Sequence, residues 1–189
     1  GVVKMLLSSG KKAIGAGAGN PPVIVDDTAD VEKAGKDIIA GCTFDNNLPC
    51  IAEKECFVLD SVADQLIDSM RRNGAYMLRG DQIKKLEETV LVEVPAKEPG
   101  KPPKKVINKD WVGRDARKIL AAIGIDVGDN VSCIICETEF SHPFVQVELM
   151  MPILAIVRCQ TFEQAVDMAV KAEHGNRHTA HLHSKNVDH

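Results

Sequence analysis

The chain has 189 residues, with 23 Lys and Arg against 27 Asp and Glu and a formal net charge of −4 at pH 7. This length favours a single domain. The mildly acidic balance argues against a protein that coats nucleic acid or an anionic membrane, because neither surface would attract it. Hydrophobic residues make up 44% and charged residues 26% of the chain, so we expect a packed core.

The longest uncharged stretch, residues 13–25, is too short to span a bilayer. The chain begins with Gly1 rather than Met, and its first residues lack the layout of a signal peptide. Six cysteines without a secretory signal favour reduced thiols in the cytoplasm. We therefore expect a cytoplasmic chain that has neither a membrane nor a nucleic acid as its partner.

Short β-branched runs alternate with amphipathic helical runs along the chain. In chain order, the pattern predicts a strand at 22–25, a helix at 31–42, a strand at 56–59, helices at 61–72, 81–90 and 115–123, strands at 131–136 and 152–159, a helix at 161–173 and a strand at 179–183. Strands separated by helices imply parallel pairing. The predicted fold class is therefore α/β, with a mostly parallel sheet covered by helices.

Residues 95–109 differ in composition from the rest, with four Pro and five Lys. Proline removes backbone donors and forbids a helix interior, so we expect an extended surface arm or loop. Such a run of Lys could attract a phosphorylated ligand, although a charge run is usually a solvated surface.

Three glycines, Gly15, Gly17 and Gly19, lie just before Asn20 and two prolines. A dinucleotide-binding loop must open a helix whose amino terminus holds the pyrophosphate. Here prolines and a strand follow the glycines, so we reject a phosphate cradle. The glycines more simply indicate close backbone approach, either to a neighbouring segment or to something bound.

Cys50 lies in a loop with two Asn and a Pro, after a helix and directly before a strand. A thiol in such a loop can be accessible and act as a nucleophile, and from its position alone a buried or incidental thiol is an equal alternative. Cys42 and Cys56 fall inside a helix and a strand, where small buried hydrophobic residues are expected.

Metal binding has two candidate patterns, and we favour neither. Cys133 and Cys136 have the spacing of a metal knuckle, but residues three apart on a strand point to opposite faces. His181 and His183 share a strand face but have no carboxylate or Cys at ligand spacing, so solvated or capping histidines are favoured. We expect no metal site.

Glu148 stands in an apolar stretch just before a predicted strand. A carboxylate there is costly unless it binds a partner, or unless it reaches solvent at the end of the strand.

Three segments together resemble the aldehyde dehydrogenase superfamily. They are residues 12–30 (KAIGAGAGNPPVIVDDTAD), 47–54 (NLPCIAEK) and 148–152 (ELMMP). Their order and spacing are most similar to the CoA-acylating aldehyde dehydrogenases of bacterial microcompartments, which handle propionaldehyde or acetaldehyde. The resemblance extends from residue 1 to residue 189.

The resemblance implies a covalent route. Cys50 matches the nucleophile that attacks the aldehyde and becomes a thioester after hydride passes to NAD(P)+. Glu148 matches the residue that holds the hydroxyls of the nicotinamide ribose. Gly15 stands where hydrolytic relatives carry a water-activating Glu, and Gly15 and Gly17 would leave room for the CoA thiol as it takes the acyl group.

The resemblance also implies parts that residues 1–189 do not contain. In the superfamily a Rossmann-type domain holds the dinucleotide, and a C-terminal portion completes the fold and the oligomer. We therefore expect residues 1–189 to be a truncated catalytic domain that does not turn over alone. The intact protein is expected to form a homo-oligomer and to work in a microcompartment, with its shell or other enzymes as candidate partners. The alternatives are a non-catalytic binding or structural module and a hydrolytic aldehyde dehydrogenase.

Overall fold

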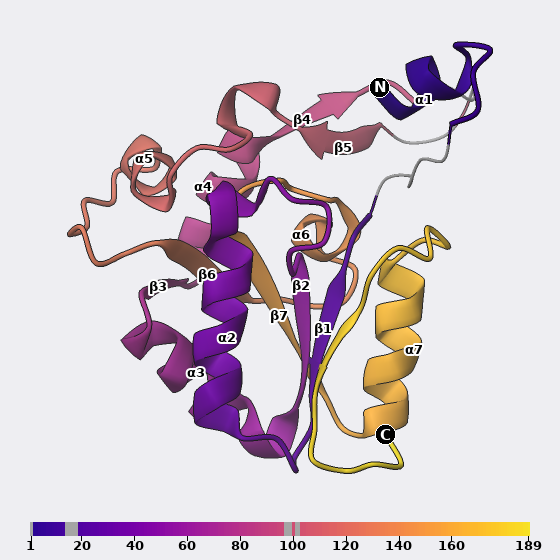
Figure 1. Ribbon diagram of the computed structural model, residues 1–189. Helices are drawn as coiled ribbons and strands as arrows, with labels where there is room; N and C mark the ends of the chain where they lie inside the picture. Colours follow the sequence, from indigo (N-terminus) through magenta and orange to yellow (C-terminus); the bar gives the residue numbers. More distant parts are fainter. Residues whose placement is uncertain (1, 14–18, 97–99, 101–102) are drawn as a thin grey trace.

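The main body of the chain is a six-stranded sheet with helices on both faces (Figure 1). The computed structural model describes residues 2–13, 19–96, 100 and 103–189. All five pairings within this sheet are parallel. The predicted α/β class is confirmed. In spatial order the strands are β3 (Ala75–Leu78), β6 (Cys133–Glu137), β7 (Ile153–Cys159), β2 (Glu55–Leu59), β1 (Pro22–Val25) and β8 (His181–His183).

Helices connect these strands, and several begin at capping side chains. Asp30 accepts a hydrogen bond from the Lys33 N–H, and Thr161 accepts one from the Gln164 N–H, so each satisfies a free donor of a first helical turn. The α-helices are α1 (Val2–Leu7), α2 (Val31–Thr43), α3 (Asp60–Arg72), α4 (Asp81–Val90), α5 (Ala116–Ala122), α6 (Pro143–Gln146) and α7 (Phe162–Ala172), and the 3-10 turns are η1 (Phe44–Asn47) and η2 (Lys109–Trp111).

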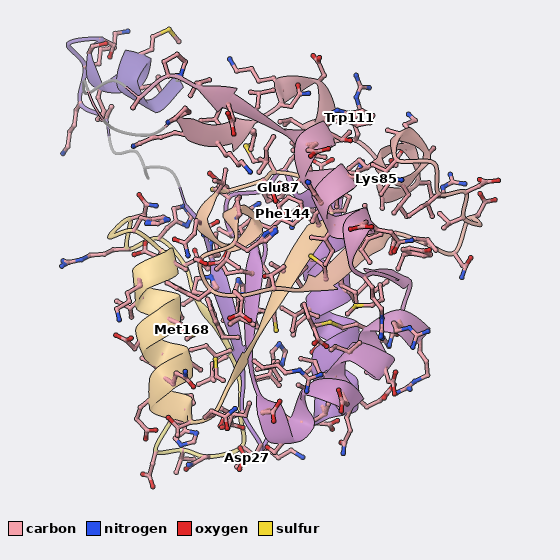
Figure 2. The ribbon with its side chains drawn as sticks, turned by 180° about the vertical axis from the view of Figure 1, so that it is seen from behind. Asp27, Lys85, Glu87, Trp111, Phe144 and Met168 are labelled. Atoms are coloured by element: carbon pink, nitrogen blue, oxygen red, sulfur yellow. The ribbon has the colours of Figure 1, made fainter. Side chains whose placement is uncertain are left out.

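Two apolar cores fill the two faces of the sheet. On one face α2 and α3 pack against the strands through Ile38, Leu66 and Met70. On the other face α4, α5, α6 and α7 pack against the strands. Phe144 and Met168 contribute side chains to this core (Figure 2). Because both faces are covered, the central strands are buried along their whole length.

The register of the central strands aligns their amino ends. Pro22, the first residue of β1, pairs with Glu55, the first residue of β2, and Glu55 pairs with Ala155 of β7. The strands are parallel, so the three segments that lead into β1, β2 and β7 meet at one edge of the sheet. Gly19, Cys50 and Glu148 lie on these three segments.

A two-stranded antiparallel hairpin of β4 (Leu91–Val94) and β5 (Lys104–Ile107) lies above the end of the sheet at which β1 begins (Figure 1). Lys105 of β5 pairs with Glu87 of α4, and His142 Nε2 lies 3.3 Å from the same carboxylate. Figure 2 shows Glu87 beside Phe144 of α6. These contacts fasten the hairpin to the body of the molecule.

Within the predicted extended surface arm or loop at 95–109, residues 104–107 form the strand β5, which was not predicted. The prolines exclude a helix and a central strand, but β5 follows the last proline, Pro103, and pairs only with β4. Strand β3 and helix α6 were also not predicted, because each has only four residues and lacks a clear period.

The other predicted elements are confirmed, with shifts of at most two residues at their ends. Cys133 and Cys136 lie in the two different cores, as the strand period predicts. Within the described residues, no helix is long and apolar enough to cross a membrane.

Candidate functional site

Cys50 lies on a tight turn that two donors hold in place. The Pro49 carbonyl oxygen accepts the Ala52 N–H at 3.1 Å and the Lys54 ammonium at 3.2 Å. The turn therefore closes around Cys50 and keeps its thiol exposed to solvent. On a second side, the ring Nε2 of His181 lies 2.9 Å from the Ile51 carbonyl oxygen.

The turn follows three successive residues in the left-handed region, Asp45, Asn46 and Asn47, with φ of 46°, 51° and 64°. This conformation is costly for most side chains but is accessible to Asp and Asn. Asn46 donates to the Gly113 carbonyl and to Asp115, both at 3.1 Å. The sequence Asp-Asn-Asn thus redirects the chain between the end of α2 and the Cys50 turn.

Asn47 fastens this segment to the core. Its side-chain nitrogen donates to the Cys42 carbonyl at 2.8 Å and to the Glu53 carbonyl at 2.9 Å. Its backbone and side-chain oxygens both accept from Lys54. Asn47 is 1% exposed, so these bonds are buried and bind the two ends of the loop to each other.

The environment of Cys50 differs from that of the other thiols, and all six cysteines lie in the described residues. The remaining five are buried. Burial raises the pKa of the Cys136 thiol to about 12 and that of the Cys159 thiol to about 11. A thiolate is the nucleophilic form of cysteine, so these buried thiols are poor nucleophiles.

Gly19 brings the glycine-rich segment against the Cys50 turn. A Cβ at this position would lie 3.0 Å from the Cys50 carbonyl oxygen and 3.2 Å from Cγ of His178. The backbone N–H of Lys54 also donates a hydrogen bond to the Pro21 carbonyl oxygen at 2.9 Å. The expectation that glycine marks a close approach is confirmed for Gly19, whereas Gly15 and Gly17 lie outside the described residues.

Glu148 is half-buried beside the same glycine. Burial raises the pKa of its carboxyl group, and the charges of Lys54 and His178 together with a hydrogen bond from the Gly19 N–H oppose this rise. Gly19 therefore contacts both the Cys50 turn and Glu148, which brings these two predicted site residues to one edge of the sheet.

Glu55 adds a second carboxyl group to this edge. It is fully buried, and neither of its oxygens has a hydrogen-bond partner among the described residues. Burial raises the pKa of Glu55 well above its ordinary value, the charge of Lys54 lowers it, and the charge of Glu148 raises it further. Burial without a hydrogen-bond partner thus favours the neutral form of the Glu55 carboxyl.

Three residues that the fold places here, Lys54, His178 and His181, were given no role at this site from the sequence, and His181 was considered only as a metal ligand. A lysine at the start of a buried strand is a signal that could have found Lys54, because an ammonium group is almost never buried without partners. The two histidines come from the far end of the chain, and only the pairing of β8 with β1 brings them to the site.

Within the described residues, no three His, Cys, Asp or Glu side chains lie close enough to hold a metal ion. The arrangement offers an exposed thiol on a hydrogen-bonded turn, with a carboxyl group and a buried ammonium group nearby. It lies at the amino edge of the strands, whereas open α/β sheets usually bind their ligands at the carboxyl edge.

The sequence model of the aldehyde dehydrogenase family matches residues 2–189. The chain belongs to this family. Acetaldehyde dehydrogenase (acetylating) EutE of Salmonella typhimurium is 44% identical over 178 residues, which cover 94% of this chain and 37% of the relative.

Two solved structures of the family are similar over 99% of this chain. One is a propionaldehyde dehydrogenase from the fucose utilisation bacterial microcompartment of Clostridium phytofermentans, at 54% identity and a TM-score of 0.87, of which 41% is covered. The other is a propionaldehyde dehydrogenase of Rhodopseudomonas palustris with bound CoA and an acylated cysteine, at 48% identity and a TM-score of 0.89, of which 40% is covered. The chain thus spans about two fifths of the length of these relatives.

Proposed function

We propose that this chain is the catalytic part of a CoA-acylating aldehyde dehydrogenase, which oxidises propionaldehyde or acetaldehyde to the acyl-CoA with NAD(P)+. The observation that carries the proposal is the exposed Cys50 thiol on a turn fastened by Lys54 and Asn47, with Gly19 between this turn and Glu148. The activities in the names of the acetylating and propionaldehyde relatives, and the acylated cysteine of one of them, support it.

Cys50 carries the covalent chemistry. Its thiolate attacks the carbonyl carbon of the aldehyde, a C–S bond forms, and the carbonyl oxygen takes up the negative charge. When this oxygen re-forms the C=O bond, the hydride leaves the same carbon and Cys50 holds a thioester. NAD(P)+, when bound, supplies the acceptor of that hydride. The CoA thiolate then attacks the thioester carbon, and Cys50 leaves as a thiolate.

Glu148 fits the role of a cofactor-binding residue. Its carboxylate accepts the Gly19 N–H and is half-buried, so it keeps free acceptor positions on a partly exposed group. Two neighbouring ribose hydroxyls are donors that such a carboxylate can bind together. We assign the nicotinamide ribose to Glu148 on this chemistry.

The proposed transfer of the acyl group to CoA rather than to water rests on two residues of the sequence, Gly15 and Gly17. With Gly15 in place of a carboxylate base, water is not activated beside the thioester, and CoA takes the acyl group. Small residues at both positions leave space for the CoA thiol. We propose that the dinucleotide-binding domain lies outside residues 1–189, and that the intact protein is a homo-oligomer of a cytoplasmic bacterial microcompartment, as the microcompartment source of one relative suggests.

The test begins with thiol labelling of the intact protein by iodoacetamide at pH 7, with the six cysteines resolved by mass spectrometry. Cys50 should react at least about tenfold faster than the five buried thiols. Equal labelling of all six cysteines would contradict the proposal and favour a non-catalytic module.

The second arm measures acyl-CoA formation from propionaldehyde, CoA and NAD+. Cys50→Ser should lower the rate by at least about 10³-fold, whereas Cys159→Ala, at a buried thiol far along β7, should keep most of it. Gly15→Glu should shift the product from acyl-CoA toward the free acid. Free acid as the main product of the wild-type protein would favour the hydrolytic alternative.

A further inference from the structure

Lys54 is a buried ammonium group, with 2% of its surface exposed. It donates to the Asn47 backbone oxygen at 2.7 Å, to the Asn47 side-chain oxygen and to the Pro49 carbonyl oxygen at 3.2 Å. Three acceptors match the three N–H donors of an ammonium group, whereas a neutral amine has only two donors. This match of donors and acceptors fits the charged form of Lys54.

The charge of Lys54 has no direct counterion among the described residues, because all three acceptors are uncharged oxygens. The groups that interact electrostatically with this charge are carboxyl groups and thiols. Burial lowers the pKa of Lys54, and Glu148, Cys42, Cys50 and Glu55 raise it, in that order. Glu55 and Cys42 are buried, so the groups best placed to carry a facing negative charge are the half-buried Glu148 and the exposed Cys50.

We propose that Lys54 is a positioning residue for Cys50, which fixes the backbone on the amino side of the thiol and supplies the buried positive charge that the Cys50 thiolate faces. This rests on the proposed function only in taking Cys50 as the nucleophile. A charge in a buried site is screened little by solvent, so it acts on the thiolate more strongly than a surface lysine would. The same charge faces the leaving thiolate when CoA takes the acyl group.

The test compares two alkylating reagents on Cys50 of the intact protein. Iodoacetate is an anion and iodoacetamide is neutral, and both need the thiolate and similar access. The ratio of their rates therefore reports the charge beside the sulfur. In the wild-type protein this ratio should exceed that of a free cysteine derivative by about three- to tenfold. Equal ratios for Cys50 and the free thiol would overturn the proposal without any variant.

Lys54→Met and Lys54→Gln should bring the ratio down to that of the free thiol, and Lys54→Arg should keep it high because it preserves the charge. Lys33→Met is the matched control, since Lys33 is exposed in the first turn of α2, at the other end of the helix from the Cys50 loop. An unchanged ratio in folded Lys54→Met and Lys54→Gln proteins would also overturn the proposal.

The alkylation test uses neither aldehyde, CoA nor cofactor, so its result is separate from that of the proposed function. In the acyl-CoA assay, Lys54→Met should lower kcat at least about tenfold with a smaller change in the KM for the cofactor, and Lys54→Arg should restore part of kcat. A loss confined to the KM would contradict a role at Cys50.

Discussion

The two edges of the sheet differ in how their charged groups are paired. At the carboxyl edge, Arg158 of β7 pairs with Asp60, Asp64 and Glu137, and Asp26 after β1 accepts hydrogen bonds from its neighbours. At the amino edge, within the part of the chain that the structure describes, Lys54 has only neutral acceptors and the Glu55 carboxyl has no partner.

This difference shows in the pKa directions. Burial raises the pKa of Asp26, but hydrogen bonds from Ser184, Thr28 and His189 outweigh burial and bring it down to about 2. Burial prevails at Glu55, whose pKa is raised, and at Lys54, whose pKa is lowered. At the carboxyl edge, hydrogen bonds thus offset the cost of burying a charge. At the amino edge, which holds Cys50, burial shifts the pKa of both groups away from the charged form, as is common at functional sites.

The largest expected effect concerns Asn47, the one residue that gives Lys54 two acceptors. Asn47→Ala removes an acceptor of a buried charge and two buried donor bonds, and we expect the free energy of unfolding to fall by about 3–4 kcal/mol in urea titrations. Asn47→Gly relieves the left-handed backbone and should lose about 1 kcal/mol less. A loss below about 1 kcal/mol for Asn47→Ala would contradict the importance of this anchor.

The next effect is at the carboxyl edge. The pKa of Asp26 is about 2 in the folded protein and 3.8 as its ordinary value, so its stabilisation is present above pH 4 and is lost as the pH falls toward 2. Asp26→Asn should therefore be about 2 kcal/mol less stable than wild type at pH 7, and the gap should close by pH 2. Asp27→Asn, at the exposed neighbour, should keep the wild-type pH dependence.

The smallest expected effect is a gain in stability, and it concerns Glu55 at the amino edge. The folded pKa of Glu55 is raised above its ordinary value of 4.5, so folding becomes less favourable as the pH rises above that value. Glu55→Gln imitates the neutral acid and should be about 1–2 kcal/mol more stable than wild type at pH 7, with no difference below pH 4. Exposed Glu88→Gln serves as the control. Destabilisation by Glu55→Gln at pH 7 would remove the contrast between the two edges.

Local patterns in the sequence predicted much of the fold. Helix α7 is identified by its capping residue and its helical spacing of apolar residues, and strand β7 by its run of β-branched residues. The alternation of strands and helices along the chain predicts parallel pairing. Strand β5 was missed because its partner β4 is ten residues away, beyond a proline-rich segment. Short strands depend on pairing more than on their own residues.

The site was predicted in part. Cys50 and Glu148 were selected as candidates from their loops and then from a resemblance to the family, and their roles in catalysis are proposals that the experiments above test. Lys54 was not selected, because its residue type gives no sign of burial and its place at the start of a buried strand was the one signal available. Its three acceptors exist only because Asp45, Asn46 and Asn47 turn the chain back on itself.

The sequence by itself therefore determined the fold class, the family and the thiol most expected to react, since these depend on residue type and on short-range order along the chain. The tertiary structure decided which edge of the sheet holds the site, which charges are paired there, and that residues as distant as Gly19, Cys50, Glu148 and His178 meet. Desolvation and partner geometry set the state of each charged group, and both arise only when distant segments pack together.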